Sequence, residues 1–246
     1  MKPYQKIPIQ DCGEPLVAIP LEQFAVESPH PYQKLGAPYH LCGVDSPYYL
    51  RQEVLNRLIA AQTQLQSQYS GWKISIFDAY RPVEVQQFMV DYTLAETLET
   101  RGLKLDFITP EQHQAILEEV YEFWAVPSLE PTTPPPHSTG AAVDVTLVNA
   151  SGETVNMGSP VDELSPRSYP NHFAKSSDPI KQSYHQNRQL LTEVMNSAGF
   201  QQHPKEWWHF SFGDQLWAWS KYQQNPDEHQ FAKYGRYNFR HLGTVE

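Results

Sequence analysis

The sequence predicts a single domain of the α+β class, in which helices flank a sheet. Helical patterns and strand patterns occur in separate blocks along the 246 residues, rather than in strict alternation. Hydrophobic residues make up 40% of the chain and aromatic residues 13%, which is typical of a globular protein with one large core.

The first part of the chain is expected to wrap this domain. Residues 1–45 are rich in Pro, Tyr and Gly and show little periodicity. Ser46 and Pro47 then fit the N-cap and the first position of a helix. The apolar positions of that helix follow helical spacing and are Leu50, Val54, Leu58, Ile59 and Leu65.

The next block predicts one strand followed by two helices. The segment WKISIFDAY, residues 72–80, alternates apolar and polar side chains as a strand does. Residues 83–101 predict a helix that stops at a glycine. The segment TPEQ, residues 109–112, is a capping box with proline at the first helical position, and it opens a helix that runs to about Trp124.

A proline-rich segment, residues 127–136, separates the two halves of the chain. We interpret it as a stiff loop within one domain, because the strand that follows needs partners. The remaining predicted elements are a strand at 141–148, a turn at 149–152, a returning strand at 153–157, a helix at 180–198 and an aromatic strand over WWHFSF at 207–212.

Two residues of metal-binding type lie where the proline loop meets this strand. His137 follows the prolines, and Asp144 lies inside the strand between two valines. A carboxylate in an apolar strand is costly unless something pairs with it or binds it, and a metal ion is one solution. Taken alone, the pair more often represents a loop histidine and a hydrogen-bonded aspartate.

The segment KEWWHF, residues 205–210, adds an imidazole and a carboxylate. Catalytic zinc sites typically use three protein ligands and leave the fourth position to water, so His209 completes a set with His137 and Asp144. Glu206 then fits the role of general base. The alternative is a salt-bridged Glu206 beside core tryptophans. Residues three apart on a regular strand face opposite ways, so we expect an irregular strand entry or a bulge at Glu206.

Arg81, in the segment DAYRP, is the remaining candidate for chemistry. It lies at a strand end just before a proline, a common place for functional side chains. A guanidinium there can stabilise an oxyanion. An ion pair with Asp78 or another carboxylate is at least as compatible with the spacing.

The motifs DAYRP, HSTGAAVDVTL, MGSPVD and KEWWHF, in this order, resemble the zinc D-alanyl-D-alanine dipeptidases of the VanX type. The resemblance extends from about Tyr49 to Phe212. It implies one α+β domain with a central, mostly antiparallel sheet over residues 1–246. Within that domain, 1–45 is the wrapping segment and 214–246 is a C-terminal extension.

The resemblance also implies hydrolysis of D-alanyl-D-alanine, or of a related D-amino-acid dipeptide, by metal-activated water in cell-wall peptidoglycan metabolism. The family commonly has a serine two residues before the first histidine, where this chain has Pro135, so substrate contact on that side must be made differently. The implied roles are His137, Asp144 and His209 as ligands of one Zn²⁺ per chain, Glu206 as catalytic base, Arg81 as the arginine that stabilises the transition state, and Asp162 as an acidic residue near the substrate's free amino group.

Two other functions remain open. A peptidoglycan D,D-carboxypeptidase or endopeptidase would need an open cleft for a longer chain. A non-catalytic, zinc-stabilised binding domain would close the metal with four protein ligands and would not need Glu206. His203 is the nearest conceivable fourth ligand in that case.

Charge and composition exclude further classes of partner. The net charge of −10, without a basic stripe, argues against nucleic-acid binding. The absence of an 18-residue apolar run and of a signal-like N-terminus leads us to expect a cytoplasmic protein without a membrane partner. Reduced thiols are the simpler expectation for Cys12 and Cys42, and a single bridge in an exported form is the alternative. The oligomeric state is not predicted.

Overall fold

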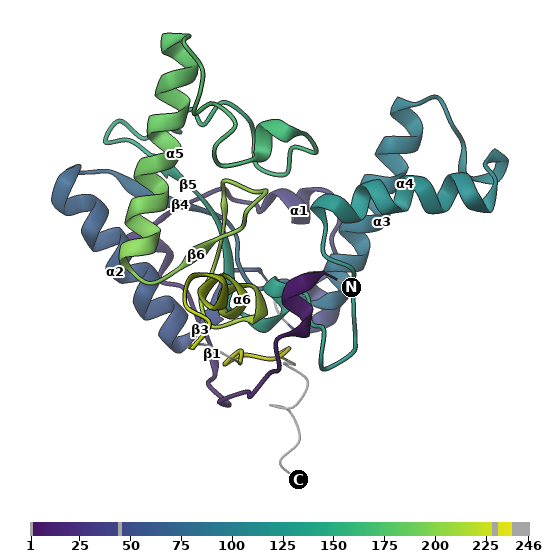
Figure 1. The fold of residues 1–246 in the computed structure, drawn as a ribbon, viewed down its shortest axis with the longest axis horizontal. Helices are drawn as coiled ribbons and strands as arrows, with labels where there is room; N and C mark the ends of the chain where they lie inside the picture. Colours follow the sequence, from purple (N-terminus) through teal and green to yellow (C-terminus); the bar gives the residue numbers. More distant parts are fainter. Residues whose placement is uncertain (1, 44–45, 228–230, 238–246) are drawn as a thin grey trace.

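A five-stranded sheet forms the centre of the computed structural model, which describes residues 2–43, 46–227 and 231–237 (Figure 1). The strand order is β2-β4-β5-β7-β6, and only the β2–β4 pair is parallel. A mostly antiparallel sheet in an α+β fold is therefore confirmed. The strands are β2 (Ala25–Val26), β4 (Lys73–Asp78), β5 (Ala142–Val148), β6 (Gln201–Gln202) and β7 (His209–Ser211).

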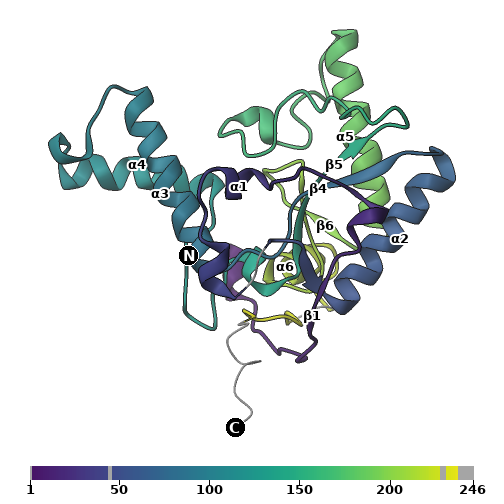
Figure 2. The ribbon, with the colours of Figure 1, turned by 180° about the vertical axis from the view of Figure 1, so that it is seen from behind.

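Helices surround this sheet in two groups, which Figures 1 and 2 show from opposite sides. One group, α2 and α5, lies side by side and buries apolar side chains against the sheet. The other group, α3 and α4, forms an arm that projects from the body of the molecule (Figure 1). The helices are α1 (Pro31–Lys34), α2 (Gln52–Gln68), α3 (Val83–Thr100), α4 (Pro110–Phe123), α5 (Pro179–Ser197) and α6 (Gln215–Gln224).

The two faces of the sheet carry different chemistry. On β5, Val143 and Val145 point into the main core, so the residue between them, Asp144, points to the opposite face. On β7, Phe210 points into the same core, and Asp144 pairs directly with His209 across the two strands. The polar face of β5 and β7 is thus the place where the candidate ligands meet.

An irregularity in β4 brings a second acidic residue to that face. Ile76 pairs with Val145 and belongs to the core, but Asp78 pairs with Asp144, so Phe77 is an extra residue on β4. Such a bulge re-aims the side chains that follow it. Because of the bulge, Asp78 lies in the same cross-strand row as Asp144 and His209.

The predicted helix start at Ser46-Pro47 is wrong. Tyr49–Arg51 forms strand β3, which pairs antiparallel with β1 (Leu16–Ala18), and α2 begins only at Gln52. Pairing with a distant segment overrides the local helix signal here. Residues 1–45 therefore do more than wrap the domain. They supply β1, which pairs with β3, and β2, which is an edge strand of the central sheet.

Two predicted strands are shorter than expected. The returning strand at 153–157 is reduced to one bridge between Val148 and Thr154. Trp207 and Trp208 lie in bends before β7, so the aromatic strand begins only at His209. The predicted helices at 83–101, from Pro110 and at 180–198 are confirmed within one or two residues, including the Thr109 capping box of α4.

The C-terminal part of the chain also packs on this frame. Within the predicted C-terminal extension, α6 packs against the core, whereas 228–230 and 238–246 lie outside the described residues. No disulfide joins Cys12 and Cys42. Over the described part of the chain, no helix has the length and apolar character needed to cross a membrane.

Candidate active site

Three buried side chains form the centre of the site. Nε2 of His137 lies 3.2 Å from Oδ2 of Asp144, and Nδ1 of His209 lies 3.0 Å from Oδ1 of the same carboxylate. The two histidine nitrogens are 3.1 Å apart. One ligand atom from each residue therefore falls within 4.8 Å of the others, as the sequence pattern predicted.

Hydrogen bonds on the outer side of each imidazole determine which nitrogen faces the centre. Nδ1–H of His137 donates to the carbonyl of Ala79 at 2.7 Å, so its Nε2 is left as an acceptor. Nε2–H of His209 donates to Oγ of Ser211 at 3.2 Å, and the Ser211 hydroxyl donates to Asp214 at 2.8 Å. The Nδ1 of His209 is then also an acceptor.

One nitrogen of each imidazole therefore faces the Asp144 carboxylate, and a cation at that point, either a proton or a metal ion, satisfies all three groups. Burial alone would raise the pKa of Asp144, but His137 and His209 hold that pKa well below its usual range. A buried cluster of acceptors is satisfied by a cation, and two imidazoles with one carboxylate is a donor set that Zn²⁺ prefers. The residues present therefore fit a zinc ion.

Glu206 reaches this cluster from an irregular segment. It lies in the connection between β6 and β7, and its Oε2 is 3.8 Å from Nδ1 of His209. The regular strand starts only at His209, which explains how residues 206 and 209 approach the same point. Burial raises the pKa of Glu206, and the nearby His209 partly offsets this. The expected irregular strand entry is present.

Arg81 makes the ion pair that the spacing allowed and also lies beside the cluster. Its Nη2 lies 2.6 Å from Oδ2 of Asp78 and 3.5 Å from Oδ2 of Asp144. Its Nε also donates to Asp78 at 2.7 Å, and its Nη1 donates to the Gln86 side chain at 2.9 Å. The guanidinium is buried and held in one orientation at the edge of the site.

Asp162 lies in the loop after β5, and its side chain reaches Tyr32 beside Arg81. Its Oδ2 accepts a hydrogen bond of 2.6 Å from the hydroxyl of Tyr32, which also lies 3.3 Å from Nη2 of Arg81. The backbone of Asp162 has φ of 62°, a conformation that costs energy for a residue other than glycine. Burial raises the pKa of Asp162 to about 7, and the charge of Asp144 adds to this effect.

All six predicted site residues line one cavity, together with side chains from the N-terminal turn and from the end of α4. Trp208 is part of the cavity wall, whereas Trp207 packs on the other side of its loop and donates to Ser159. His203 also lines the cavity, but it lies outside the three-residue ligand cluster. The centre therefore keeps an open side toward the cavity.

Several residues of this site carry no local signal in the sequence. Tyr32 belongs to a four-residue helix in the N-terminal segment. Lys2 and Tyr4 line the cavity from η1 (Pro3–Lys6) and the residue before it. Asp214 is the N-cap of α6 and lies outside the stretch that the sequence motifs cover.

Comparisons with known proteins agree with the resemblance. A family model described as D-Ala-D-Ala dipeptidase matches residues 6–232, a longer stretch than the motifs cover. A D-alanyl-D-alanine dipeptidase of Synechocystis is 51% identical over 242 residues, which are 96% of this chain and 97% of that protein. A D-alanyl-D-alanine dipeptidase of Enterococcus faecalis is 31% identical over 161 residues, 64% of this chain and 71% of that protein. The solved structure of VanYB in complex with D-alanine-D-alanine has a TM-score of 0.43 and 18% identity, and the match covers 72% of this chain and 78% of that chain.

Proposed function

The chain belongs to the D-Ala-D-Ala dipeptidase family of peptidases, and on that premise we propose that it hydrolyses D-alanyl-D-alanine, or a closely related D-amino-acid dipeptide, in a zinc-dependent reaction. The observation that carries this proposal is the approach of Glu206 to the His137–Asp144–His209 cluster, within 3.8 Å, at the side that opens into the cavity. Three ligands, a base and an open position are the parts that a hydrolytic metal site needs.

His137, Asp144 and His209 would hold the zinc ion, which would supply a Lewis acid for the peptide carbonyl and would lower the pKa of the attacking water. Glu206 accepts one proton from the attacking water as the water oxygen bonds to the carbonyl carbon. Glu206 then gives that proton to the leaving nitrogen as the C–N bond breaks. A carboxylate whose pKa is raised by burial accepts and returns a proton more readily near neutral pH than an exposed glutamate does.

Arg81 adds positive charge where the carbonyl oxygen becomes negative. Its guanidinium is already oriented by Asp78 and Gln86, so little reorganisation is needed when the oxyanion forms. The ion pair with Asp78 and the catalytic role are therefore compatible, because the pair holds the arginine at the edge of the cluster.

Asp162 provides an anionic group for the substrate's free ammonium. It lies on the cavity wall next to Tyr32 and Arg81, and a bound ammonium would favour its ionised form. A substrate with a free amino group at that point is a dipeptide, since a longer chain continues in the N-terminal direction. This favours the dipeptidase over the carboxypeptidase and endopeptidase alternatives.

The test is a substrate panel of D,D-, L,D- and L,L-alanyl-alanine and one pentapeptide ending in D-Ala-D-Ala, with and without a chelator. We expect turnover of the D,D-dipeptide that the chelator abolishes and that zinc restores. Comparable turnover of the pentapeptide would favour the carboxypeptidase alternative. An absence of turnover for every peptide would refute the proposed function.

A variant pair tests the base. Glu206→Gln preserves size and should retain zinc while kcat falls by a factor of about 10² to 10⁴. The control is Glu99→Gln, an exposed residue on α3, which should behave as wild type. Activity of Glu206→Gln near the wild-type value would remove Glu206 from the mechanism.

A further inference from the structure

The cavity contains a cation that the proposed mechanism does not use. Lys2 lines the cavity with Arg81, and these are its two permanently cationic side chains among the described residues. Arg81 is engaged by Asp78, Gln86 and Tyr32. For the ammonium of Lys2, no hydrogen bond or ion pair is found within 2–43, 46–227 and 231–237.

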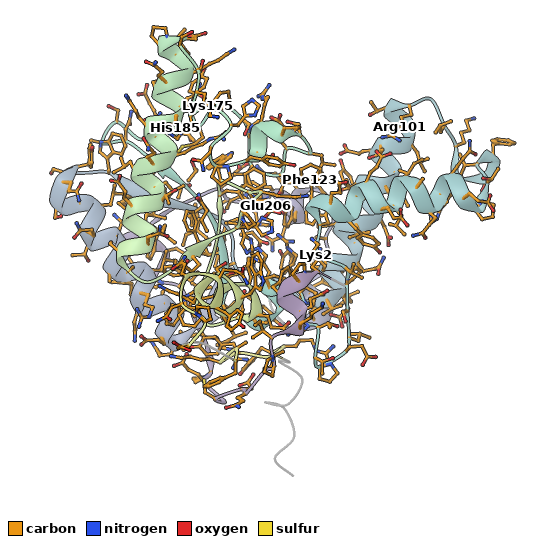
Figure 3. The ribbon with its side chains drawn as sticks, in the orientation of Figure 1. Lys2, Arg101, Phe123, Lys175, His185 and Glu206 are labelled. Atoms are coloured by element: carbon orange, nitrogen blue, oxygen red, sulfur yellow. The ribbon has the colours of Figure 1, made fainter. Side chains whose placement is uncertain are left out.

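The backbone around Lys2 is well anchored, although the residue precedes the first helical turn. The Lys2 amide donates to the Gln5 side chain at 2.8 Å, and the Lys2 carbonyl accepts from the Gln5 amide at 3.1 Å. The side chain of Gln215, at the start of α6, donates to the carbonyl of Ile7 at 2.7 Å. Figure 3 shows Lys2 near Glu206 and Phe123, where this turn faces the end of α4.

Lys2 and Asp162 lie beside different parts of the site. Asp162 is hydrogen-bonded to Tyr32, which in turn accepts from Arg81, whereas Lys2 lines the cavity from the N-terminal turn, near Glu206 (Figure 3). Glu206 is the residue that delivers a proton to the leaving nitrogen. A cation beside Glu206 is therefore on the side of the departing amino acid, whose own α-carboxylate lies one carbon away from that nitrogen.

We propose that the Lys2 ammonium binds the α-carboxylate of the dipeptide's C-terminal residue and makes the site selective for substrates with a free C-terminus. The inference rests on the proposed function, since it assigns the second end of the same substrate. A zwitterionic dipeptide would then be held by Asp162 at its ammonium and by Lys2 at its carboxylate, with the peptide bond between them at the ligand cluster.

Two further observations support this role. Pro135, two residues before His137, offers neither a hydroxyl nor an N–H to a substrate carboxylate, and its carbonyl already accepts from both the amide and the hydroxyl of Ser138. Lys2 is half-buried, and none of the carboxylates in the described part of the chain lies within ion-pair distance of its ammonium, Glu206 included, which contacts His203 and His209 instead. A substrate carboxylate would supply a counter-ion.

The test compares D-Ala-D-Ala with its C-terminal amide, which lacks the carboxylate charge. The variants are Lys2→Gln, which removes the charge, and Lys2→Arg, which retains it. Lys6→Gln, an exposed position on the same helical turn, is the matched control. Zinc affinity by chelator competition and the thermal midpoint are measured for each variant, to show that the metal site and the fold are intact.

We expect Lys2→Gln to raise KM for D-Ala-D-Ala by about tenfold or more, which is the value of one charge-assisted hydrogen bond, with kcat changed by less than about threefold. Wild type should prefer the free acid over the amide by a similar factor, and Lys2→Gln should lose that preference. Lys2→Arg should keep most of it, and Lys6→Gln all of it.

Failure of the inference and failure of the proposed function give different results. If wild type cleaves neither the free acid nor the amide, the proposed function is refuted and the assignment of Lys2 falls with it. If wild type cleaves D-Ala-D-Ala and Lys2→Gln keeps the full preference for the free acid, only the role of Lys2 is refuted.

Discussion

The chain of hydrogen bonds behind His209 predicts how tightly the site holds zinc. His209 donates to Ser211, and Ser211 donates to Asp214, so the Nδ1 lone pair of His209 faces the cluster. Ser211→Ala removes the acceptor for His209. Asp214→Asn removes the charge behind it, yet it preserves the N-cap of α6, because asparagine caps about as well as aspartate.

The expected loss follows from what each change removes. Partners of this kind, one step behind a metal ligand, are typically worth a factor of 10 to 100 in metal affinity, which is about 1.4 to 2.7 kcal/mol. Ser211→Ala should fall in this range, because the hydrogen bond from His209 is lost completely. Asp214→Asn should lie near the lower end. The double variant should cost little more than Ser211→Ala alone, because both residues act through the same hydrogen bond.

The assay is zinc competition against a fluorescent chelator, with the folding of the metal-free protein checked by circular dichroism. Asp178→Asn is the matched control, because Asp178 is the N-cap of α5 and accepts from the Ile180 amide at 2.8 Å outside the site. Zinc dissociation constants within twofold of wild type for both Ser211→Ala and Asp214→Asn would refute the reasoning.

Three further predictions concern the ligands, the buried arginine and pH. His137→Ala should lose zinc, and a stoichiometric zinc content measured by atomic absorption would contradict its role as a ligand. Arg81→Ala should lower the free energy of unfolding in urea by about 3 to 5 kcal/mol, because it leaves Asp78 buried without its cation, whereas truncation of the exposed Arg101 should leave that free energy nearly unchanged. Folded Asp162, with a pKa of about 7, holds a proton that the unfolded chain releases above a pKa of about 4. The stability of the metal-free protein should therefore fall as pH rises from about 4 through 7. This loss of stability should be smaller in Asp162→Asn. If urea titrations give the same pH dependence for Asp162→Asn and wild type, the raised pKa of Asp162 is contradicted.

The elements that the sequence predicted correctly are those specified by neighbouring residues. The capping box at Thr109 and the glycine after α3 act within one helical turn, so α3 and α4 were found with nearly correct ends. The helix start at Ser46 was predicted wrongly because the structure there depends on distant residues. Its caps were plausible, but Tyr49–Arg51 pairs with a strand more than 30 residues earlier, and local patterns do not report such pairing.

The candidate site divides in the same way. His137, Asp144 and Glu206 were found because short motifs contain them, and their meeting at one point follows from the pairing of β5 with β7. Lys2, which lines the cavity, and Tyr32, which contacts Asp162, were not found, because each belongs to a segment with weak periodicity. Their place depends on how the N-terminal segment packs, which is a property of the whole fold.

The bulge at Phe77 makes the molecule sensitive to chain length in a way that substitutions would not reveal. Replacement of the Phe77 side chain leaves the extra backbone unit in place, and its carbonyl can still accept from His30, as it does at 2.6 Å. Deletion of that one residue would close the bulge. Asp78 would then follow Ile76 directly and would still face away from the core, but the carbonyl that accepts from His30 would be removed. The contact with His30 therefore depends on the backbone of residue 77 rather than on its side chain.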